Sequence, residues 1–272
     1  MTDMELTLPL ILIALLLFIV GAAVGSFISV LSYRLHHDHK GIVKGRSKCT
    51  TCEKPLKALD LIPILSYLTL RGRCRYCAEP ISFMYPLLEL ITGAAFVLLF
   101  LHFPFVVPDL FFSMDLLGLY LLHAFYLIIL IFTFFYDLQY LHVADSVILP
   151  GILVGLIATM APQTPHIFDS LLGAAVAIIF FGLQILLSRG RWLGEGDLRI
   201  GIFMGVILGW KLVIVALFLS YIIGSIASLV IVARTKKVRG VKIALGPFLV
   251  IGTLISLFWG ERILGWYLGV LI

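Results

Sequence analysis

The feature that most constrains this chain is a succession of apolar runs, each of about the length that crosses a lipid bilayer. A transmembrane helix needs roughly 20 predominantly apolar residues, and such runs extend from residues 8–31 to a final stretch that begins at Ile243. Because 61% of the 272 residues are hydrophobic and only 13% are charged, a soluble fold is excluded. We therefore expect an all-α polytopic membrane protein with about eight transmembrane helices.

The basic residues predict how the chain threads the membrane. A polar insert at 34–82 holds ten of the twenty Lys and Arg residues, and a second basic cluster lies at 234–242. The positive-inside rule places both in the cytoplasm. The connections at 104–115 and 162–169 contain no Lys or Arg and are expected outside. The net charge of +5 therefore indicates membrane orientation, and we expect no nucleic acid partner.

This threading divides the chain into a first transmembrane helix within 1–33, a cytoplasmic loop domain at 34–82 and a transmembrane region at 83–272. The first run is longer than the apolar core of a signal peptide and lacks a convincing cleavage site, so we expect it to remain a helix. The later spans are expected at 83–103, 116–136, 143–161, 170–188, 200–210, 212–233 and from 243 onward.

All four cysteines lie in the polar insert and form two C-x-x-C pairs. Cys49 and Cys52 are followed after 21 residues by Cys74 and Cys77, a spacing typical of a four-thiolate zinc site. A reducing cytoplasm argues against two disulfides, and four thiolates leave no open coordination position. We therefore predict a structural zinc ion between the first two membrane helices, with redox sensing as the weaker alternative.

Two aspartates stand at the expected cytoplasmic ends of membrane spans. Asp137 ends the third span, and Asp197 begins the sixth within the motif G-x-G-D. Each aspartate alone is compatible with a simple helix cap. Together, two carboxylates at one membrane depth supply the dyad of an aspartic protease. In such a dyad one ionised carboxylate activates a water molecule, and the other, protonated, donates to the scissile carbonyl.

Four further residues are predicted to support this dyad. Gly194 and Gly196 let the backbone approach a substrate closely, or supply unusual dihedral angles that present Asp197. Glu89 lies inside the second span, where a carboxylate is hard to solvate, and Asp145 begins the fourth span. Each of these two acids is interpreted either as a substrate contact or as an interface charge.

Taken together, these residues resemble the type IV prepilin leader peptidases, also called prepilin peptidase/N-methyltransferases, over nearly the whole chain. The resemblance is carried by the segment 25–35, the cysteine block 49–89 and the sequence Gly246-Pro247-Phe248 in the last span. Asp137 matches the first catalytic aspartate of that family, and Asp197 in G-x-G-D matches the second.

The chain departs from the family pattern at three positions. Ser29 stands where the family usually has Asn, Ala144 precedes Asp145 where a Pro-Asp pair is typical, and Arg199 replaces a Lys. None of these departures removes a carboxylate, so the peptidase interpretation stands.

The resemblance implies a membrane aspartic endopeptidase of the bacterial inner membrane, with its dyad and cysteine loop facing the cytoplasm. Its substrates would be type IV prepilins or secretion pseudopilins, from which such enzymes cut the short basic leader, typically after a glycine. The resemblance also implies methylation of the new N-terminal residue with S-adenosylmethionine, an activity tied in the family to the cysteine loop.

Three other functions fit parts of the sequence. A broader G-x-G-D intramembrane protease shares the dyad, but the long cysteine loop speaks against it. An ion or solute transporter would use the intramembrane acids to carry ions, and a zinc-bearing scaffold would need neither aspartate. Loss of peptide cleavage when Asp137 or Asp197 is replaced distinguishes the protease from the transporter and the scaffold.

Overall fold

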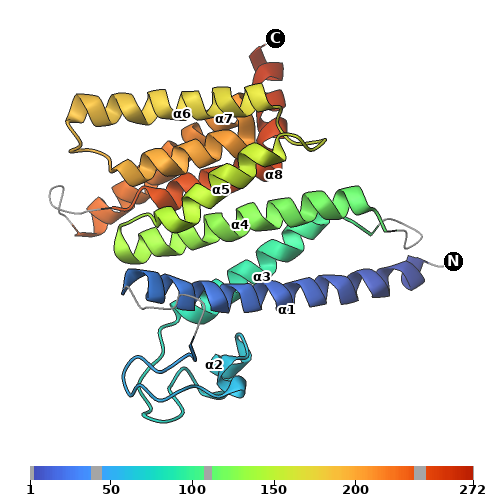
Figure 1. Ribbon diagram of the computed structural model, residues 1–272, viewed down its shortest axis with the longest axis vertical. Coiled ribbons are helices and arrows are strands. Elements are labelled where there is room, and N and C mark those ends of the chain that lie inside the picture. Colours follow the sequence, from blue (N-terminus) through green and yellow to red (C-terminus); the bar gives the residue numbers. More distant parts are fainter. Residues whose placement is uncertain (1–2, 38–44, 107–111, 236–242, 272) are drawn as a thin grey trace. The chain divides into compact units, whose positions relative to one another are not determined.

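The computed structural model describes residues 3–37, 45–106, 112–235 and 243–271, and within these residues every regular element is a helix (Figure 1). The elements are α1 Asp3–His36, the 3-10 helix η1 Ala58–Leu61, α2 Leu65–Thr69, α3 Met84–His102, α4 Met114–Tyr140, α5 Asp145–Ala158, α6 Ile167–Ser188, α7 Glu195–Thr235 and α8 Gly246–Leu271. The all-α fold expected from the apolar runs is confirmed.

Among the described residues, six helices are long and apolar enough to cross a membrane, and α5 is a shorter apolar helix of 14 residues. One of the six, α7, has 41 residues. At 1.5 Å per residue it would measure about 60 Å, twice the thickness of the hydrocarbon core. It is interrupted at Gly209, where φ is 74° and ψ is 173°. With α7 counted as two segments and α5 included, the expected eight spans are all present as helices.

The two parts of α7, before and after Gly209, both pack against α6. Phe181 of α6 lies against Gly201 in the first part. One turn further along α6, Gln184 accepts a hydrogen bond of 3.0 Å from the hydroxyl of Tyr221 in the second part. The chain therefore doubles back at Gly209, where a positive φ favours glycine over any residue with a Cβ.

Glycine contacts hold α6, α7 and α8 closely together. The backbones of Gly173 in α6 and Gly205 in α7 touch, so that neither position has room for a Cβ atom. In the second part of α7, Ser220 lies against Gly252 of α8. Small residues at such crossings let helices approach closely in lipid, where van der Waals packing drives association.

The chain divides into two compact units, Met1–Ile128 and Ile129–Ile272. In the first unit α1 packs on α3 through glycines: Gly21 lies against Gly93, and Gly25 lies against the backbone of Glu89. The described part of the cysteine segment, with η1 and α2, also belongs to this unit. The second unit holds the α6, α7 and α8 contacts described above, with Phe203 and Leu249 fully buried.

Candidate active site and metal centre

Asp137 lies in the last turn of α4, and only 6% of its surface is exposed. The helix was expected to end at this residue but continues to Tyr140, and Leu141 then takes a φ of 52° that ends it. The amide of Leu141 donates to the carbonyl of Asp137. Because Asp137 is inside the helix, its side chain is held by regular backbone rather than by a loop.

Asp197 occupies the first turn of α7, as expected. Its Oδ2 accepts a hydrogen bond of 3.3 Å from the backbone N–H of Gly194. This bond is half of a capping box, in which an acidic residue of the first turn reaches back to the amide that precedes the helix. Capping and catalysis are therefore compatible at this position, because the cap fixes the direction of the carboxylate.

Asp137 and Asp197 both lie in the second unit, and Asp137 adjoins the start of α8. Asp197 lies within electrostatic range of Asp137, whose carboxylate accepts a hydrogen bond from the backbone N–H of Gly246. A Cβ atom at Gly246 would collide with Oδ2 of Asp137 and would lie 3.1 Å from the side chain of Ile200 in α7. The ends of α4, α7 and α8 thus form one junction around the two acids.

Asp145 lies in the first turn of α5 and forms an ion pair with α7. Its Oδ1 is 2.8 Å from Nη1 of Arg199, two residues after Asp197, and Nη2 of Arg199 is 3.6 Å from Glu195. Both side chains of the closer pair are partly exposed, so solvent screens the interaction. Two of the three departures from the family pattern therefore lie at this ion pair: Arg199 is one of its members, and Ala144 directly precedes the other.

The two glycines of the G-x-G-D motif have different surroundings. Neither has a positive φ, so unusual dihedral angles do not explain them. A Cβ atom at Gly196 would lie 2.7 Å from Cγ2 of Val143, which shows that Gly196 lets α7 pack on the segment between α4 and α5. A Cβ atom at Gly194 would meet only the backbone nitrogen of Gly196, at an ordinary contact distance of 3.9 Å.

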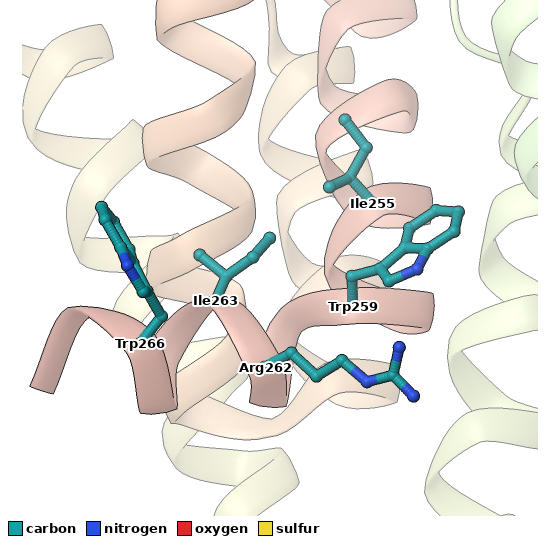
Figure 2. A pocket seen from close by; sticks show the side chains of 5 residues that line it. All are labelled: Ile255, Trp259, Arg262, Ile263 and Trp266. Atoms are coloured by element: carbon teal, nitrogen blue, oxygen red, sulfur yellow. The ribbon is translucent and has the colours of Figure 1, made fainter. Parts of the chain in front are cut away.

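Two hollows border α8, and they differ in their distance from the acids. One has a volume of about 560 Å³ and is lined by α6, the second part of α7 and residues 243–248. The other, of about 420 Å³, is lined by Ile255, Trp259, Arg262, Ile263 and Trp266 (Figure 2). Figure 2 shows α8 turning between Ile255 and Arg262. This second hollow begins about 14 Å along α8 from Gly246, so only the first adjoins the junction.

In the first unit the four cysteines converge. The Sγ atoms of Cys49, Cys52, Cys74 and Cys77 all lie within 4.8 Å of one another, and those of Cys49 and Cys77 are 3.8 Å apart. A tetrahedral ion with Zn–S distances of about 2.3 Å requires S···S separations of about 3.8 Å. The donor set and its spacing therefore fit a zinc ion.

The two cysteine pairs repeat one backbone pattern. In each, the amide of the first cysteine donates to the carbonyl five residues later, and an amide four residues later donates back to it. Glu53 and Ala78 occupy equivalent positions with φ near 60°. The same pattern is visible in the sequence as a repeated C-x-x-C-x-x-P that ends at Pro55 and Pro80.

The backbone of the first pair favours the thiolate that binds metal. The amide of Cys52 is the main cause that lowers the pKa of Cys49 to about 6. At Cys77 the amide of Glu79 acts in the same direction, but burial and the other three thiols outweigh it and raise the pKa to about 12. The amide contact therefore favours the thiolate at Cys49, which is the form in which a cysteine binds a metal ion.

Two acids fix the cysteine segment. Asp60, whose side chain is 2% exposed, accepts a bond of 2.6 Å from Arg75 and one of 3.1 Å from the amide of Lys57. Burial alone would raise the pKa of Asp60, but these bonds hold it below its usual range. Glu89, buried in α3, accepts a bond of 2.7 Å from the amide of Ile64. Glu89 therefore holds the loop backbone, whereas the other supporting residues lie with the aspartates in the second unit.

Comparisons with known proteins connect both centres to one family. The family model described as the bacterial peptidase A24 N-terminal domain matches residues 19–103, and that of the type IV leader peptidase family matches residues 124–229. A prepilin leader peptidase/N-methyltransferase of Legionella pneumophila is 33% identical over 277 residues, which cover 91% of each chain. This chain belongs to the type IV leader peptidase family.

Other members of the type IV leader peptidase family are similar along most of their length. The prepilin leader peptidase/N-methyltransferase of Aeromonas hydrophila is 29% identical over 93% of each chain. That of Bacillus subtilis (strain 168) is 28% identical over 93% of this chain and 97% of its own. No solved structure matches the chain.

Several contacts of the two centres were not predicted from the sequence. Gly246 was noted only as part of a family signature, and nothing in the sequence paired it with Asp137. Arg75 as the partner of Asp60, and Arg199 as the partner of Asp145, were also missed. The repeated C-x-x-C-x-x-P was an available signal for the matching backbone turns, because equal motifs suggest equal local folds.

Proposed function

We propose that this protein is a membrane aspartic endopeptidase that removes the short basic leader of a type IV prepilin or pseudopilin, using Asp137 and Asp197. Relatives that align with more than nine-tenths of this chain are each named prepilin leader peptidase/N-methyltransferase. The observation that carries the assignment of residues is the junction of α4, α7 and α8, where a buried Asp137 lies within electrostatic range of Asp197.

The chemistry of such a pair is hydrolysis without a covalent intermediate. One ionised carboxylate takes a proton from water, and the resulting hydroxide attacks the carbonyl carbon of the scissile peptide bond. The other carboxyl group donates its proton to the carbonyl oxygen. Collapse of the tetrahedral intermediate breaks the C–N bond and passes a proton to the leaving amine. The two acids titrate as a unit, because close like charges do not both ionise cheaply.

The membrane orientation follows from the positions of the basic residues. If the polar insert and the segment at 234–242 face the cytoplasm of a bacterial inner membrane, both aspartates lie at the cytoplasmic ends of their helices. A substrate with a basic leader and an apolar helix presents the bond between them at this same depth. The bond and the dyad then meet without either leaving the interface.

The cysteine segment is proposed to hold one structural zinc ion. Cys49, Cys52, Cys74 and Cys77 would ligate it, and Asp60 and Glu89 hold the backbone around them. The ion would replace the hydrophobic core that so short a segment lacks. Methylation of the new amine with S-adenosylmethionine is included in the proposal on the strength of the relatives' names, and we assign no residue to it.

Mass spectrometry of the reaction products tests this function. The purified protein in lipid vesicles is incubated with a peptide that has a basic leader, a glycine and an apolar helix, with and without S-adenosylmethionine. We expect the leader to be lost in both cases, and a methyl group on the new N-terminus only when the donor is present. An intact peptide under both conditions would refute the peptidase, and a cleaved but unmethylated product would refute the methyltransferase.

A further inference from the structure

The 560 Å³ hollow, called the cavity below, is an open groove between three helices of the second unit. It is lined by Gln184 of α6, by Tyr221, Ser225 and Ser228 of α7, and by residues at the start of α8 that include Leu245 and Phe248. Its volume lies within the range of about 300–1,000 Å³ that is usual for pockets that hold small ligands. A whole helix does not fit such a space, but the side chains of a single helical turn do.

The cavity adjoins both proposed catalytic acids. On the side of Asp197, its lining includes Trp192 and Leu193, which directly precede Gly194, the amide donor to that carboxylate. Tyr221 also lies within electrostatic range of Asp197. On the side of Asp137, Leu245 and Phe248 flank Gly246, whose amide binds that carboxylate.

The chemistry of the walls favours an apolar occupant. None of the described residues that line the cavity carries a charge. Several polar side chains of the lining already have hydrogen-bond partners. The Tyr221 hydroxyl donates to Gln184, the amide nitrogen of Gln184 donates to the carbonyl of Phe180, and the Ser228 hydroxyl donates to the carbonyl of Gly224. A basic leader peptide or a charged methyl donor would find no counter-charge in this lining.

We propose that this cavity receives the first apolar turn of the substrate helix, directly after the bond that is cut. This inference rests on the proposed function, because it takes the substrate to be a basic leader joined to an apolar helix. The leader side of the bond remains in water, and the helix side enters the cavity. Seating this turn against Phe248 and Tyr221 places the bond beside Asp137 and Asp197.

Filling the cavity tests the inference by steady-state kinetics. Ser225→Phe places a ring in the lining of the cavity, whereas the neighbouring Ile226 is 57% exposed and is not part of the lining, so that Ile226→Phe is the matched control. We expect Ser225→Phe to raise KM by about 10-fold or more, the usual effect of a lost apolar contact in a pocket. The control should keep the wild-type KM. Equal KM values in all three proteins would overturn the inference.

Photo-crosslinking provides a readout that a misfolded variant does not affect. A benzophenone amino acid replaces Leu229, which borders the cavity but is 69% exposed, in protein that retains its heat-denaturation midpoint. The captured substrate fragment is identified by mass spectrometry. Capture of the first turn after the cut bond supports the inference, whereas capture of lipid alone or of the leader overturns it. If the wild type cleaves the peptide normally while both tests fail, the cavity assignment falls and the peptidase stands; if the wild type does not cleave, the proposed function itself falls.

Discussion

Gly246 shows how a residue without a side chain shapes the proposed active site. Its amide binds the Asp137 carboxylate, and a Cβ atom there would occupy the position of Oδ2. The single methyl group of Gly246→Ala must therefore displace Asp137. A shift of about 1 Å in a catalytic group costs on the order of 100-fold in rate, and we expect a loss of about that size in a cleavage assay.

A glycine on the same helix provides the control for this substitution. Gly265 of α8 has open space where a Cβ atom would be, so Gly265→Ala should cleave at the wild-type rate. Full activity of Gly246→Ala would show that Asp137 does not depend on this contact. A loss of equal size in both variants would show that α8 tolerates no substitution, whatever its position.

The pair Asp145–Arg199 is predicted to align the start of α7 and hence Asp197. The two side chains are 47% and 34% exposed and solvent screens their attraction, so its effect is modest. We expect Asp145→Asn and Arg199→Gln each to lower kcat about twofold to fivefold, the range that corresponds to a screened pair of up to about 1 kcal/mol. The double variant Asp145→Asn/Arg199→Gln should lose no more activity than either single variant, because each single substitution already removes the pair. Independent, multiplicative effects in this double-mutant cycle would contradict a pairing role.

At the scale of elements, the crossing of α6 and α7 is the contact most sensitive to added volume. The backbones of Gly173 and Gly205 touch, so Gly205→Ala must push the helices apart. Overpacking of this kind costs about 1–3 kcal/mol, measured as a lower midpoint of heat denaturation in detergent. Gly182→Ala, in open space on α6, is the control and should leave the midpoint unchanged.

The cysteine segment is predicted to fold only around a metal ion. We expect about one zinc ion per purified chain, and its loss, with rapid proteolysis between residues 53 and 73, in Cys74→Ser or after treatment with a chelator. Cys74 is buried, whereas Thr50 lies exposed between the ligands of the first pair, so Thr50→Ala should keep its metal and its protection. Unchanged zinc content in Cys74→Ser would contradict the four-thiolate site.

Most of the helices were predictable because their apolar runs match the bilayer thickness, a constraint that is local in the sequence. The end of α4 was not predictable from the sequence. The helix continues through Tyr140 and ends at Leu141, which has a positive φ, and no glycine or proline marks that position. The break in α7 was predicted within two residues, because a single helix of that length would exceed the membrane. Contacts between distant residues, such as Asp137 with Gly246, carry no periodic signal and required the fold.

At the scale of the whole molecule, each compact unit carries one centre. The thiolate cluster belongs to the unit Met1–Ile128, and both aspartates belong to Ile129–Ile272. The C-x-x-C spacing predicted the thiolate cluster from the sequence, because the two ligands of each pair lie close together along the chain. The aspartate pair was predicted less directly, from the placement of both acids at the cytoplasmic ends of spans and from the resemblance to a family, because two complete helices, α5 and α6, separate them in the sequence.

Cleavage of a leader-bearing apolar peptide by Asp137→Asn and Asp197→Asn in lipid vesicles tests most directly whether these two aspartates form the catalytic pair. Asparagine keeps the size of each side chain and removes the group that exchanges a proton. Asp115→Asn, an exposed position in the first turn of α4, serves as the control. We predict that both dyad variants keep the wild-type helix content and zinc but leave the leader uncut, while the control cleaves normally. Normal cleavage by either dyad variant would contradict the account.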